Sequence, residues 1–260
     1  MTQEQRFALI SEYLSQHPDL SVEDAQDLCD ASPATVRRDF TVLVDQGKVR
    51  RTWGGVTVRT NEVTPTGNML PANYREVTRR EEKKRIAAAA AGRVQDGEIV
   101  MIGSGTTTME LAALLANRPV RIVTNSLLLA FQVDQQRTQK RGADVFLIGG
   151  MLLPDAGVMI GPRTNEELNL YHADRAFFSA GGVTPDAVTS AHPLIAETER
   201  TLMQRCGRIS LLVDHTKLGR REMLPLCPPD HLDAVITDDH PDGQSVRKAL
   251  QEQKIEVITS

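Results

Sequence analysis

The feature that most constrains the fold of this chain is a series of short apolar runs, rich in Val and Ile, that alternate with stretches of helical periodicity. The runs are GEIVMIG, VRIVTN, ADVFLIGG, RAFFSAGG, RISLLVD, DAVITD and IEVIT, and all lie between residues 97 and 259. Helical patterns such as TMELAALLA and SLLLAFQVDQQ separate them. Short buried strands divided by helices predict an α/β domain with a mostly parallel sheet that is covered on both faces.

Small polar loops follow several of these predicted strands, at the carboxyl edge where parallel sheets bind ligands. The first strand continues into GSGTTT at residues 103–108, which opens a helix. Its backbone N–H groups, its hydroxyls and the positive end of the helix dipole would all attract an anion. Similar loops are TNS at 124–126, Gly-Gly at 149–150, SAGG at 179–182 and VDHTKLG at 213–219. Together they predict a site for a phosphate-bearing ligand, although GSGTTT matches neither the P-loop nor the dinucleotide fingerprint.

The first sixty residues have a different pattern, in which helices are separated by a tight turn. Ser21 is in position to cap a short helix, with Asp24 three residues further on. Ser32 then caps another helix, whose first residue is Pro33. The apolar stripe of that helix is formed by Val36, Phe40, Leu43 and Val44. This is the helix-turn-helix arrangement, whose second helix enters the major groove of DNA.

The charge of this region is distributed as a DNA-binding face requires. The whole chain has a net charge of −4, and residues 1–30 hold one basic and seven acidic residues, but residues 31–60 hold six basic and two acidic ones. After Gly47, KVRRTWGGV is predicted to form a hairpin wing whose basic side chains contact phosphates. The predicted DNA-binding residues are Ser32, Ala34, Thr35, Arg37, Arg38, Lys48, Arg50 and Arg51.

These motifs resemble the N-terminal signature of the DeoR family of bacterial transcription regulators. That family has a Ser-x-x-Thr-[Ile/Val]-Arg-Arg-Asp-[Leu/Phe] helix, followed by a Gly, a basic strand and a Gly-Gly pair. Here the helix motif occupies residues 32–40, and Gly47, the basic strand with Arg50 and Arg51, and Gly54–Gly55 follow it.

The rest of the chain resembles the sensor domain of the same family. The family pattern appears at Gly103–Thr107, Thr124–Asn125, Gly149–Gly150, Ala173–Phe177, Gly181–Gly182, Glu197–Glu199 and Asp214–Lys217. The resemblance implies a fold like the ribose-5-phosphate isomerase and CoA-transferase group, and a phosphorylated sugar or related metabolite as effector. One position departs from the pattern, because the family's usual Asp before Ser-Gly-Thr-Thr is Gly103 here. This change indicates a different ligand, or a weakened or absent response.

Pattern and resemblance together give the predicted effector-binding residues. They are Gly103, Ser104, Gly105, Thr106, Thr107, Thr108, Thr124, Asn125, Gly149, Gly150, Gly181, Gly182, Glu197 and Lys217. No metal or cofactor site is predicted, because the histidines lack HxxxH spacing and the three cysteines lack CxxC spacing. The cysteines are expected to be packing residues or inert thiols.

Three parts are predicted along the chain: a winged helix-turn-helix domain at 1–57, a linker at 58–78 and an α/β effector-sensing domain at 79–260. The linker is inferred from its Thr, Pro, Gly and Asn content. After it, RREEKKR at 79–85 is predicted to be a solvated helix face that leads into a closely packed run of alanines. No apolar run approaches the roughly 20 residues of a membrane span and the N-terminus does not resemble a signal peptide, so the expected location is the cytoplasm.

The expected function is that of a DNA-binding regulator rather than an enzyme. We expect a homo-oligomeric repressor of a carbohydrate-use operon, whose hold on operator DNA is changed by a phosphorylated sugar. The main alternative is an active sugar-phosphate isomerase with a DNA-binding appendage, which needs a general base close to the substrate. SAGGV at 179–183 offers no acidic residue where ribose-5-phosphate isomerases carry them, which leaves Glu197, Glu199 and Asp214 as bases for that alternative. A further alternative is an architectural DNA-binding protein whose sensor domain no longer responds.

Overall fold

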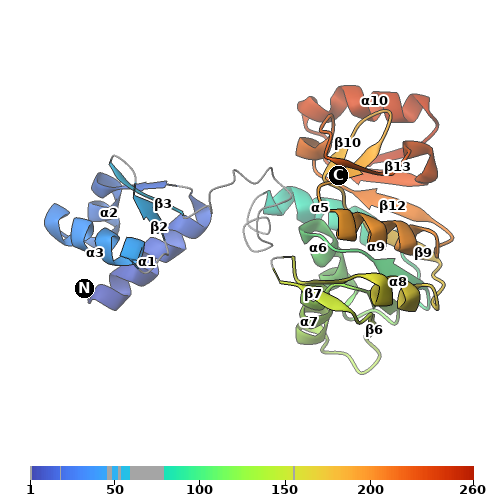
Figure 1. Cartoon of the computed structure of the whole chain (residues 1–260), viewed down its shortest axis with the longest axis horizontal. Coiled ribbons are helices and arrows are strands. Elements are labelled where there is room, and N and C mark those ends of the chain that lie inside the picture. Colours follow the sequence, from blue (N-terminus) through green and yellow to red (C-terminus); the bar gives the residue numbers. More distant parts are fainter. Residues whose placement is uncertain (1, 18, 46–48, 52–53, 59–78, 155) are drawn as a thin grey trace. The chain divides into compact units, whose positions relative to one another are not determined.

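The computed structural model describes residues 2–17, 19–45, 49–51, 54–58, 79–154 and 156–260. The chain divides into two compact units, Met1–Thr66 and Gly67–Ser260. In Figure 1 the smaller unit is blue and the larger one runs from green to red. The linker predicted at 58–78 lies outside the described residues apart from Val58, so it stays a prediction.

The smaller unit combines three helices with a three-stranded antiparallel sheet. Its elements are α1 (Gln3–Gln16), β1 (Asp19–Ser21), α2 (Val22–Cys29), α3 (Pro33–Asp45), β2 (Val49–Arg51) and β3 (Gly55–Val58). The strand order is β1-β3-β2, so β2 and β3 form the wing expected from the sequence. Gly55 is required by this pairing, because a Cβ there would overlap the carbonyl oxygen of Leu20 on β1.

The sequence signals at the ends of α2 and α3 work as expected. Ser21 Oγ accepts a hydrogen bond from the backbone N–H of Asp24 at 3.0 Å, and α2 ends at Asp30 in the left-handed conformation. Ser32 Oγ accepts the N–H of Thr35 at 3.3 Å at the start of α3. The apolar core beneath is formed by Ile10, Leu14, Leu20, Ala25, Cys29, Val36, Phe40, Leu43, Val49 and Val56. The predicted helix-turn-helix is therefore confirmed as a structure.

The larger unit is built on a seven-stranded parallel sheet whose strands are the seven apolar runs of the sequence. They are β4 (Ile99–Ile102), β5 (Arg121–Thr124), β6 (Asp144–Leu147), β9 (Arg175–Phe178), β12 (Ile209–Leu212), β14 (Ala234–Thr237) and β15 (Glu256–Thr259). The strand order is β15-β14-β12-β9-β4-β5-β6. The order reverses between β4 and β9, because strands that follow β4 in the chain extend to one side and strands that follow β9 extend to the other.

Helices cover both faces of this sheet (Figure 1). One face packs against α5 (Arg80–Ala91), α6 (Thr106–Leu115) and α7 (Leu127–Gln136). The other packs against α8 (Pro162–Leu168), α9 (Pro193–Met203) and α10 (Gln244–Glu252). Successive residues of a strand point to opposite faces: Ile102 packs in the core beneath α5, α6 and α7, and Met101 packs in the core on the other face. The predicted α/β architecture is confirmed.

Several short elements at the edges of the sheet were not predicted from the sequence. An antiparallel sheet contains β10 (Gly182–Val183), β11 (Val188–Ser190) and β13 (Leu224–Cys227), and a hairpin contains β7 (Met151–Leu153) and β8 (Val158–Ile160). Three 3₁₀ turns are η1 (His215–Lys217), η2 (Pro229–His231) and η3 (Pro241–Gly243).

Candidate functional site

A pocket lies at the carboxyl edge of the seven-stranded sheet, where the strand order reverses. Its lining includes a residue from the loop after each of four adjacent strands: Ser126 after β5, Ser104 after β4, Ser179 after β9 and Asp214 after β12. The cavity has a volume of about 200 Å³. Such a reversal point is where open α/β sheets bind their ligands.

The first turn of α6 forms one wall of this pocket. Gly105, with φ 153°, precedes the helix, and a Cβ on it would lie 3.0 Å from the Cβ of Ser179. Glycine therefore lets the loops after β4 and β9 approach each other. Thr106 and Thr107 follow and bring hydroxyls to the lining. The backbone N–H groups at this helix start, together with its dipole, attract negative charge.

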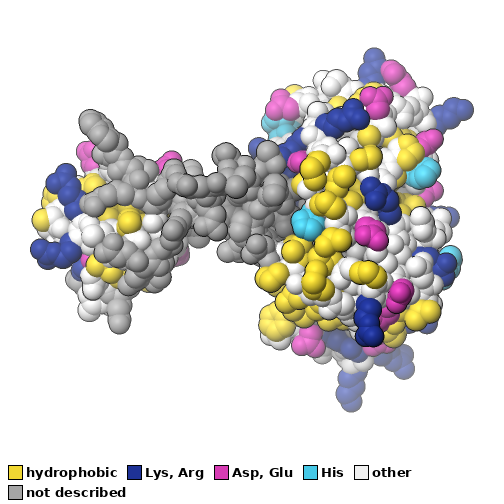
Figure 2. Space-filling model, in the orientation of Figure 1, with side chains coloured by type: hydrophobic (Ala, Val, Ile, Leu, Met, Phe, Trp, Pro, Cys, Tyr) yellow, Lys and Arg dark blue, Asp and Glu magenta, His cyan; other side chains and the backbone are white. Residues whose placement is uncertain are grey.

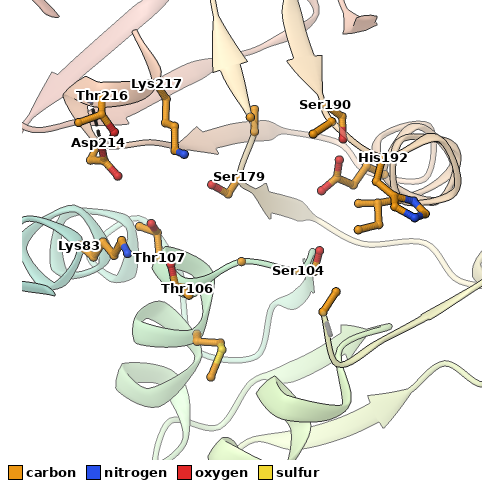
Figure 3. Close-up of a pocket in the computed structure, with 18 of the residues that line it drawn as sticks. Lys83, Ser104, Thr106, Thr107, Ser179, Ser190, His192, Asp214, Thr216 and Lys217 are labelled. Carbon is orange, nitrogen blue, oxygen red and sulfur yellow. Dashed lines mark hydrogen bonds between the residues drawn. The ribbon is translucent and has the colours of Figure 1, made fainter. Parts of the chain in front are cut away.

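Basic side chains surround the same helix start. Lys83 on α5, which is 6% exposed, and Lys217 at the end of η1 line the pocket, as do Arg79 and Arg220. Figure 3 shows the ammonium groups of Lys83 and Lys217 pointing into the cavity near Thr107. This end of the pocket has the donors and the positive charge that a phosphate group needs.

Two carboxylates also line the pocket. Asp214 caps η1, since it accepts hydrogen bonds from the backbone N–H of Thr216, at 3.0 Å, and from the hydroxyl of Thr216. Glu199, on α9, is 6% exposed. With four basic and two acidic lining residues, the pocket keeps an excess of positive charge.

The other end of the pocket is lined by hydroxyl and imidazole groups. Figure 3 shows Ser104, Ser190 and His192 on the side of the cavity away from Lys83. The Nδ1 atom of His192 is buried and has no hydrogen-bond partner among the described residues. A buried polar atom of this kind is costly unless a ligand or water meets it, so this end is suited to hydroxyl groups.

The structure brings part of the predicted effector set to the pocket and keeps part away. The predicted residues that line it are Ser104, Gly105, Thr106, Thr107, Gly181 and Lys217. Those that lie outside the lining are Gly103, Thr108, Thr124, Asn125, Gly149, Gly150, Gly182 and Glu197.

Several of the outlying residues hold the loops in place. The hydroxyl of Thr108 donates to the carbonyl of Gly103 at 2.8 Å, and that of Thr124 donates to the carbonyl of Ile102 at 2.7 Å. The side-chain amide of Asn125 donates to the carbonyl of Met159 at 2.8 Å. These side chains make hydrogen bonds to the backbone of the protein, which fits a role in holding the loops around the pocket.

Gly103, the departure from the family pattern, is buried. Its N–H donates to the carbonyl of Phe177 at 2.8 Å, and a Cβ on it would lie 3.2 Å from the Cβ of Phe178. An Asp at this position would need a small shift of the loop after β4 or of the neighbouring strand β9.

Sequence reasoning missed several lining residues, of which Lys83 is the most informative. The prediction of a solvated face was wrong for Lys83, which is buried. A signal was present, because Lys83 precedes the buried residues Ile86, Ala87 and Ala90 by three, four and seven positions, the spacing of one helix face. Ser126, Ser179, Ala180, Asp214 and Thr216 lie in the predicted ligand loops, and Glu199 lies in the Glu197–Glu199 motif, although none of them was in the predicted effector set. The lining residues outside these patterns are Arg79, Met109, Ala156, Ser190, Ala191, His192, Ile195 and Arg220.

The smaller unit presents a second candidate site, on α3. Arg37 and Arg38 are exposed, as are Ser32 and Ala34, while Thr35 is half-buried. Figure 2 shows Lys and Arg side chains gathered over α3 in this unit. Lys48 and the side chains of the two wing arginines lie outside the described residues, so their contacts stay predictions.

Asp39 follows these two exposed arginines in the sequence but is buried, with 1% of its surface exposed. Its carboxylate accepts hydrogen bonds from Arg6 Nε at 2.5 Å, from Arg6 Nη2 at 3.1 Å and from the amide of Gln3 at 3.1 Å. Burial raises the pKa of Asp39, but the hydrogen bonds from Arg6 and Gln3 outweigh it and hold the pKa below its usual value. The acid thus ties α3 to α1 and leaves Arg37 and Arg38 facing outward.

One histidine cluster of the larger unit has the composition of a metal site but not its geometry. His215, His240 and Asp242 place ligand atoms within 4.8 Å of one another. The two imidazole rings are stacked, with centroids 3.9 Å apart and planes at 15°, so their lone pairs run side by side instead of converging on one ion. His215 Nδ1 lies 2.6 Å from Asp238 Oδ2, which makes a buried histidine–carboxylate pair.

The cysteines and helices of the described ranges agree with the sequence expectations. Cys29, Cys206 and Cys227 are free, and burial raises the pKa of Cys206 and of Cys227 to about 12, so both remain thiols at neutral pH. Among the described residues, every helix is too short or too polar to serve as a transmembrane segment.

Comparison with known families and proteins gives matches along most of the chain. The model of a DeoR-like helix-turn-helix domain matches residues 6–62, and that of the DeoR C-terminal sensor domain matches residues 78–239. The HTH-type transcriptional repressor GlcR of Bacillus subtilis is 29% identical over 262 residues, which cover 100% of this chain and 97% of that protein. The HTH-type transcriptional regulator UlaR of Shigella dysenteriae is 29% identical over 259 residues, 99% of each chain.

Similar solved structures include a ribose 5-phosphate isomerase A from Methanocaldococcus jannaschii, with 18% identity and a TM-score of 0.38, over 54% of this chain and 55% of that one. Another is the translation initiation factor eIF-2B of Pyrococcus horikoshii OT3, with 13% identity and a TM-score of 0.43, over 63% of this chain and 66% of that one.

Proposed function

The chain belongs to the DeoR family of DNA-binding transcription regulators, and from that premise we propose that it represses a carbohydrate-use operon and leaves its operator when a phosphorylated sugar fills the pocket. In this proposal the protein acts in the cytoplasm and has no catalytic activity of its own. The name of the Bacillus relative, a transcriptional repressor, supports the sign of regulation.

The observation that carries the proposal is the convergence of Lys83, Lys217 and the first turn of α6 on one cavity. A phosphate dianion there would accept charge-assisted hydrogen bonds, each of which contributes about 1.5–3 kcal/mol. Ser104, Ser190 and Glu199 then offer partners to the hydroxyls of the sugar. A phosphate at one end and hydroxyls at the other describe a sugar phosphate.

Operator DNA is assigned to α3 and the wing. The exposed Arg37 and Arg38 lie on the face of α3 that is turned away from the apolar core of the unit. In helix-turn-helix proteins this face reads the major groove, and paired half-sites are bound by dimers. The proposal therefore includes a homo-oligomer.

The larger unit has a surface suited to such self-association. Figure 2 shows hydrophobic side chains gathered over β7 and α7. The exposed apolar residues of this region are Leu127, Leu128, Phe131, Phe146, Leu147, Met151 and Leu152. They surround β6, the edge strand of the sheet, and exposed apolar patches beside a free strand edge favour contact with another chain.

The test is a titration of the full-length protein with inorganic phosphate, ribose 5-phosphate, glucose 6-phosphate and glucosamine 6-phosphate. Thermal unfolding reports binding, and fluorescence anisotropy reports the hold on DNA from the promoter of its own operon. We expect at least one sugar phosphate to raise the melting temperature and to release the DNA.

The double variant Thr107→Val with Lys217→Ala should keep operator binding and lose release at the concentrations of sugar phosphate that release the wild type. Release that survives in this variant would place the effector elsewhere. Turnover of any of these compounds by the purified protein would instead support the isomerase alternative, with Glu199 or Asp214 as its base. A panel in which no ester stabilises the protein would support the architectural alternative.

A further inference from the structure

We propose that Arg79 reports the occupancy of the pocket to the DNA-binding unit, because its guanidinium binds the phosphate group of the ligand at the point where the chain enters α5. This inference rests on the proposed function and adds the residue through which the ligand acts. Arg79 immediately precedes α5 and lines the pocket together with Lys83. Because both residues line the same cavity, both side chains can approach one anion.

The backbone of Arg79 has a conformation that is unusual for its place. Its φ of 56° and ψ of 43° are left-handed, a region that a residue with a Cβ adopts at a cost. Two other non-glycine residues in the described ranges have a positive φ, Asp30 and Lys254, and both follow the C-terminal end of a helix, where this conformation is ordinary. Arg79 instead begins a helix, where the cap residue is normally extended, and its side chain makes no capping hydrogen bond.

The body of α5 is held firmly to the rest of the larger unit. Ile86, Ala87 and Ala90 are fully buried in the core that α5 shares with α6. Arg80 Nε also lies 3.6 Å from Glu110 Oε1 on α6. A change caused by the ligand at this end of the helix is therefore confined to its first residues and to the chain that precedes them.

The two basic residues of this turn contribute differently. Lys83 is buried and forms a fixed part of the anion site, whereas the side chain of Arg79 is exposed and can reorient. The planar guanidinium can bind two phosphate oxygens at once, which fixes its direction as well as its position. When the side chain is held in this way, the backbone at residue 79 is held too, at the point where the chain enters α5.

This contact gives the ligand a way to act at a distance. A ligand shifts the affinity for DNA only if it binds the DNA-competent and DNA-incompetent arrangements unequally. Because residues 59–78 connect Arg79 to the DNA-binding unit, an arrangement that favours the Arg79–phosphate contact also favours one direction of that connection. Strained backbone beside a binding pocket is a recurring property of such responsive positions.

The experiment separates ligand affinity from the response to a bound ligand. The probe is inorganic phosphate, followed by the sugar phosphates of the panel above, each applied to the full-length chain. Calorimetry gives the affinity for the probe, and anisotropy gives operator affinity without and with saturating probe. The variants are Arg79→Gln, Arg79→Lys and Lys217→Gln, and the matched control is Arg85→Gln, an exposed arginine of α5 that is not part of the pocket lining.

In the wild-type protein, a saturating probe should weaken operator binding by about 5- to 150-fold, the usual range of such coupling. Arg79→Gln should bind the probe up to about tenfold more weakly and, once saturated, should change operator affinity by less than about twofold. Arg79→Lys should restore part of the response. Lys217→Gln should bind the probe more weakly and respond fully once saturated, and Arg85→Gln should match the wild type throughout.

A saturated Arg79→Gln variant that releases DNA as strongly as the wild type would overturn the inference, because the response would then not pass through this residue. The wild-type measurements distinguish failure of the role assigned to Arg79 from failure of the proposed function. If the wild type responds and Arg79→Gln responds equally, only the role of Arg79 is wrong. If the wild type neither binds nor responds to any probe, the proposed function fails and this inference fails with it.

Discussion

Both units of this protein place basic side chains at the sites proposed for a phosphate-bearing partner, but in opposite surroundings. On α3, Arg37 and Arg38 are exposed to solvent. In the pocket, Lys83 is 6% exposed and lies beside the first turn of α6. An exposed cation stays hydrated and screened by salt, whereas a buried cation is screened much less.

This difference in burial suits the two proposed partners, DNA and a small phosphorylated ligand, because each is bound through its phosphate groups. Exposed arginines gain little from a single phosphate, so affinity for DNA has to come from many contacts along a long polymer. A dehydrated lysine at a helix start gains more from one phosphate, so a few groups are sufficient for a small ligand. Each prediction below would break or sharpen this contrast.

The largest expected contrast is in salt dependence. Between about 50 and 200 mM salt, a protein with roughly 6–10 phosphate contacts loses about 10³–10⁵ in DNA affinity. The affinity for the sugar phosphate should fall by less than about tenfold over the same range, because the ligand makes few contacts and one of them is with the buried Lys83, which salt screens much less. Anisotropy with operator DNA and calorimetry with ligand, each run across this range, measure the two slopes. Equal slopes would show that the pocket is open to solvent ions and that the contrast is false.

The next contrast concerns two adjacent lysines on α5. Lys83→Met should weaken ligand binding by about 1.5–3 kcal/mol, roughly 10- to 150-fold, because a buried charge-assisted hydrogen bond is lost. Lys84→Met is the matched control, since Lys84 is exposed and pairs with Glu81 at 2.8 Å outside the pocket. Calorimetry with the sugar phosphate compares the two. If both variants bind ligand as the wild type does, Lys83 is not part of the anion site.

The sequence predicted the strands of the sheet better than the residues of the pocket, and Lys83 shows why. A strand of a parallel sheet is buried on both faces, so runs such as IVMI at 99–102 are continuously apolar and easily recognised. The glycine and hydroxyl residues around Thr107 were found because the loop after the first strand binds ligands in many such sheets. Lys83 was missed because a charged residue is normally assigned to the exposed face of a helix, although its spacing places it on the buried face.

Other residues of the pocket were left out of the predicted effector set because they come from distant segments. Ser190, His192 and Glu199 reach the cavity through β11 and α9, and the position of β11 depends on its pairing with β10 and β13. Those strands have two to four residues and no hydrophobic period of their own. Tertiary packing, which short-range patterns do not encode, decides which of their side chains face the ligand.

At the exposed site on α3, Arg38→Ala should cost about 1–3 kcal/mol of operator affinity, roughly 5- to 150-fold. If Arg38 contacts a base, specificity at that base pair should relax, and if it contacts a phosphate, affinity should fall evenly across sequences. Anisotropy with the operator and with single-base substitutions of it separates these results. Ligand affinity in the absence of DNA is the internal control and should not change. Unaltered operator binding would mean that α3 is not the recognition helix.

The smallest expected effect compares one buried carboxylate in each unit. Burial raises the pKa of Asp39 and of Asp238, but hydrogen bonds, from Arg6 to Asp39 and from His215 to Asp238, lower each pKa below its usual value. An unfolded Asp has a pKa of about 3.9, so the native unit binds fewer protons than the unfolded chain near that pH. The stability that each pair contributes is therefore present above about pH 4 and is lost as the pH falls through the native pKa.

Scanning calorimetry at pH 7, 5, 4 and 3 should show the melting temperature of both units falling at the acid end. Asp39→Asn should flatten this fall in the smaller unit only, and Asp238→Asn in the larger unit only, because each removes one titrating group from one unit. The arginine beside Asp39 is charged at every pH in the series, so only the carboxylate of that pair changes its charge. An unchanged pH profile in Asp39→Asn would mean that Arg6 does not stabilise this carboxylate in solution.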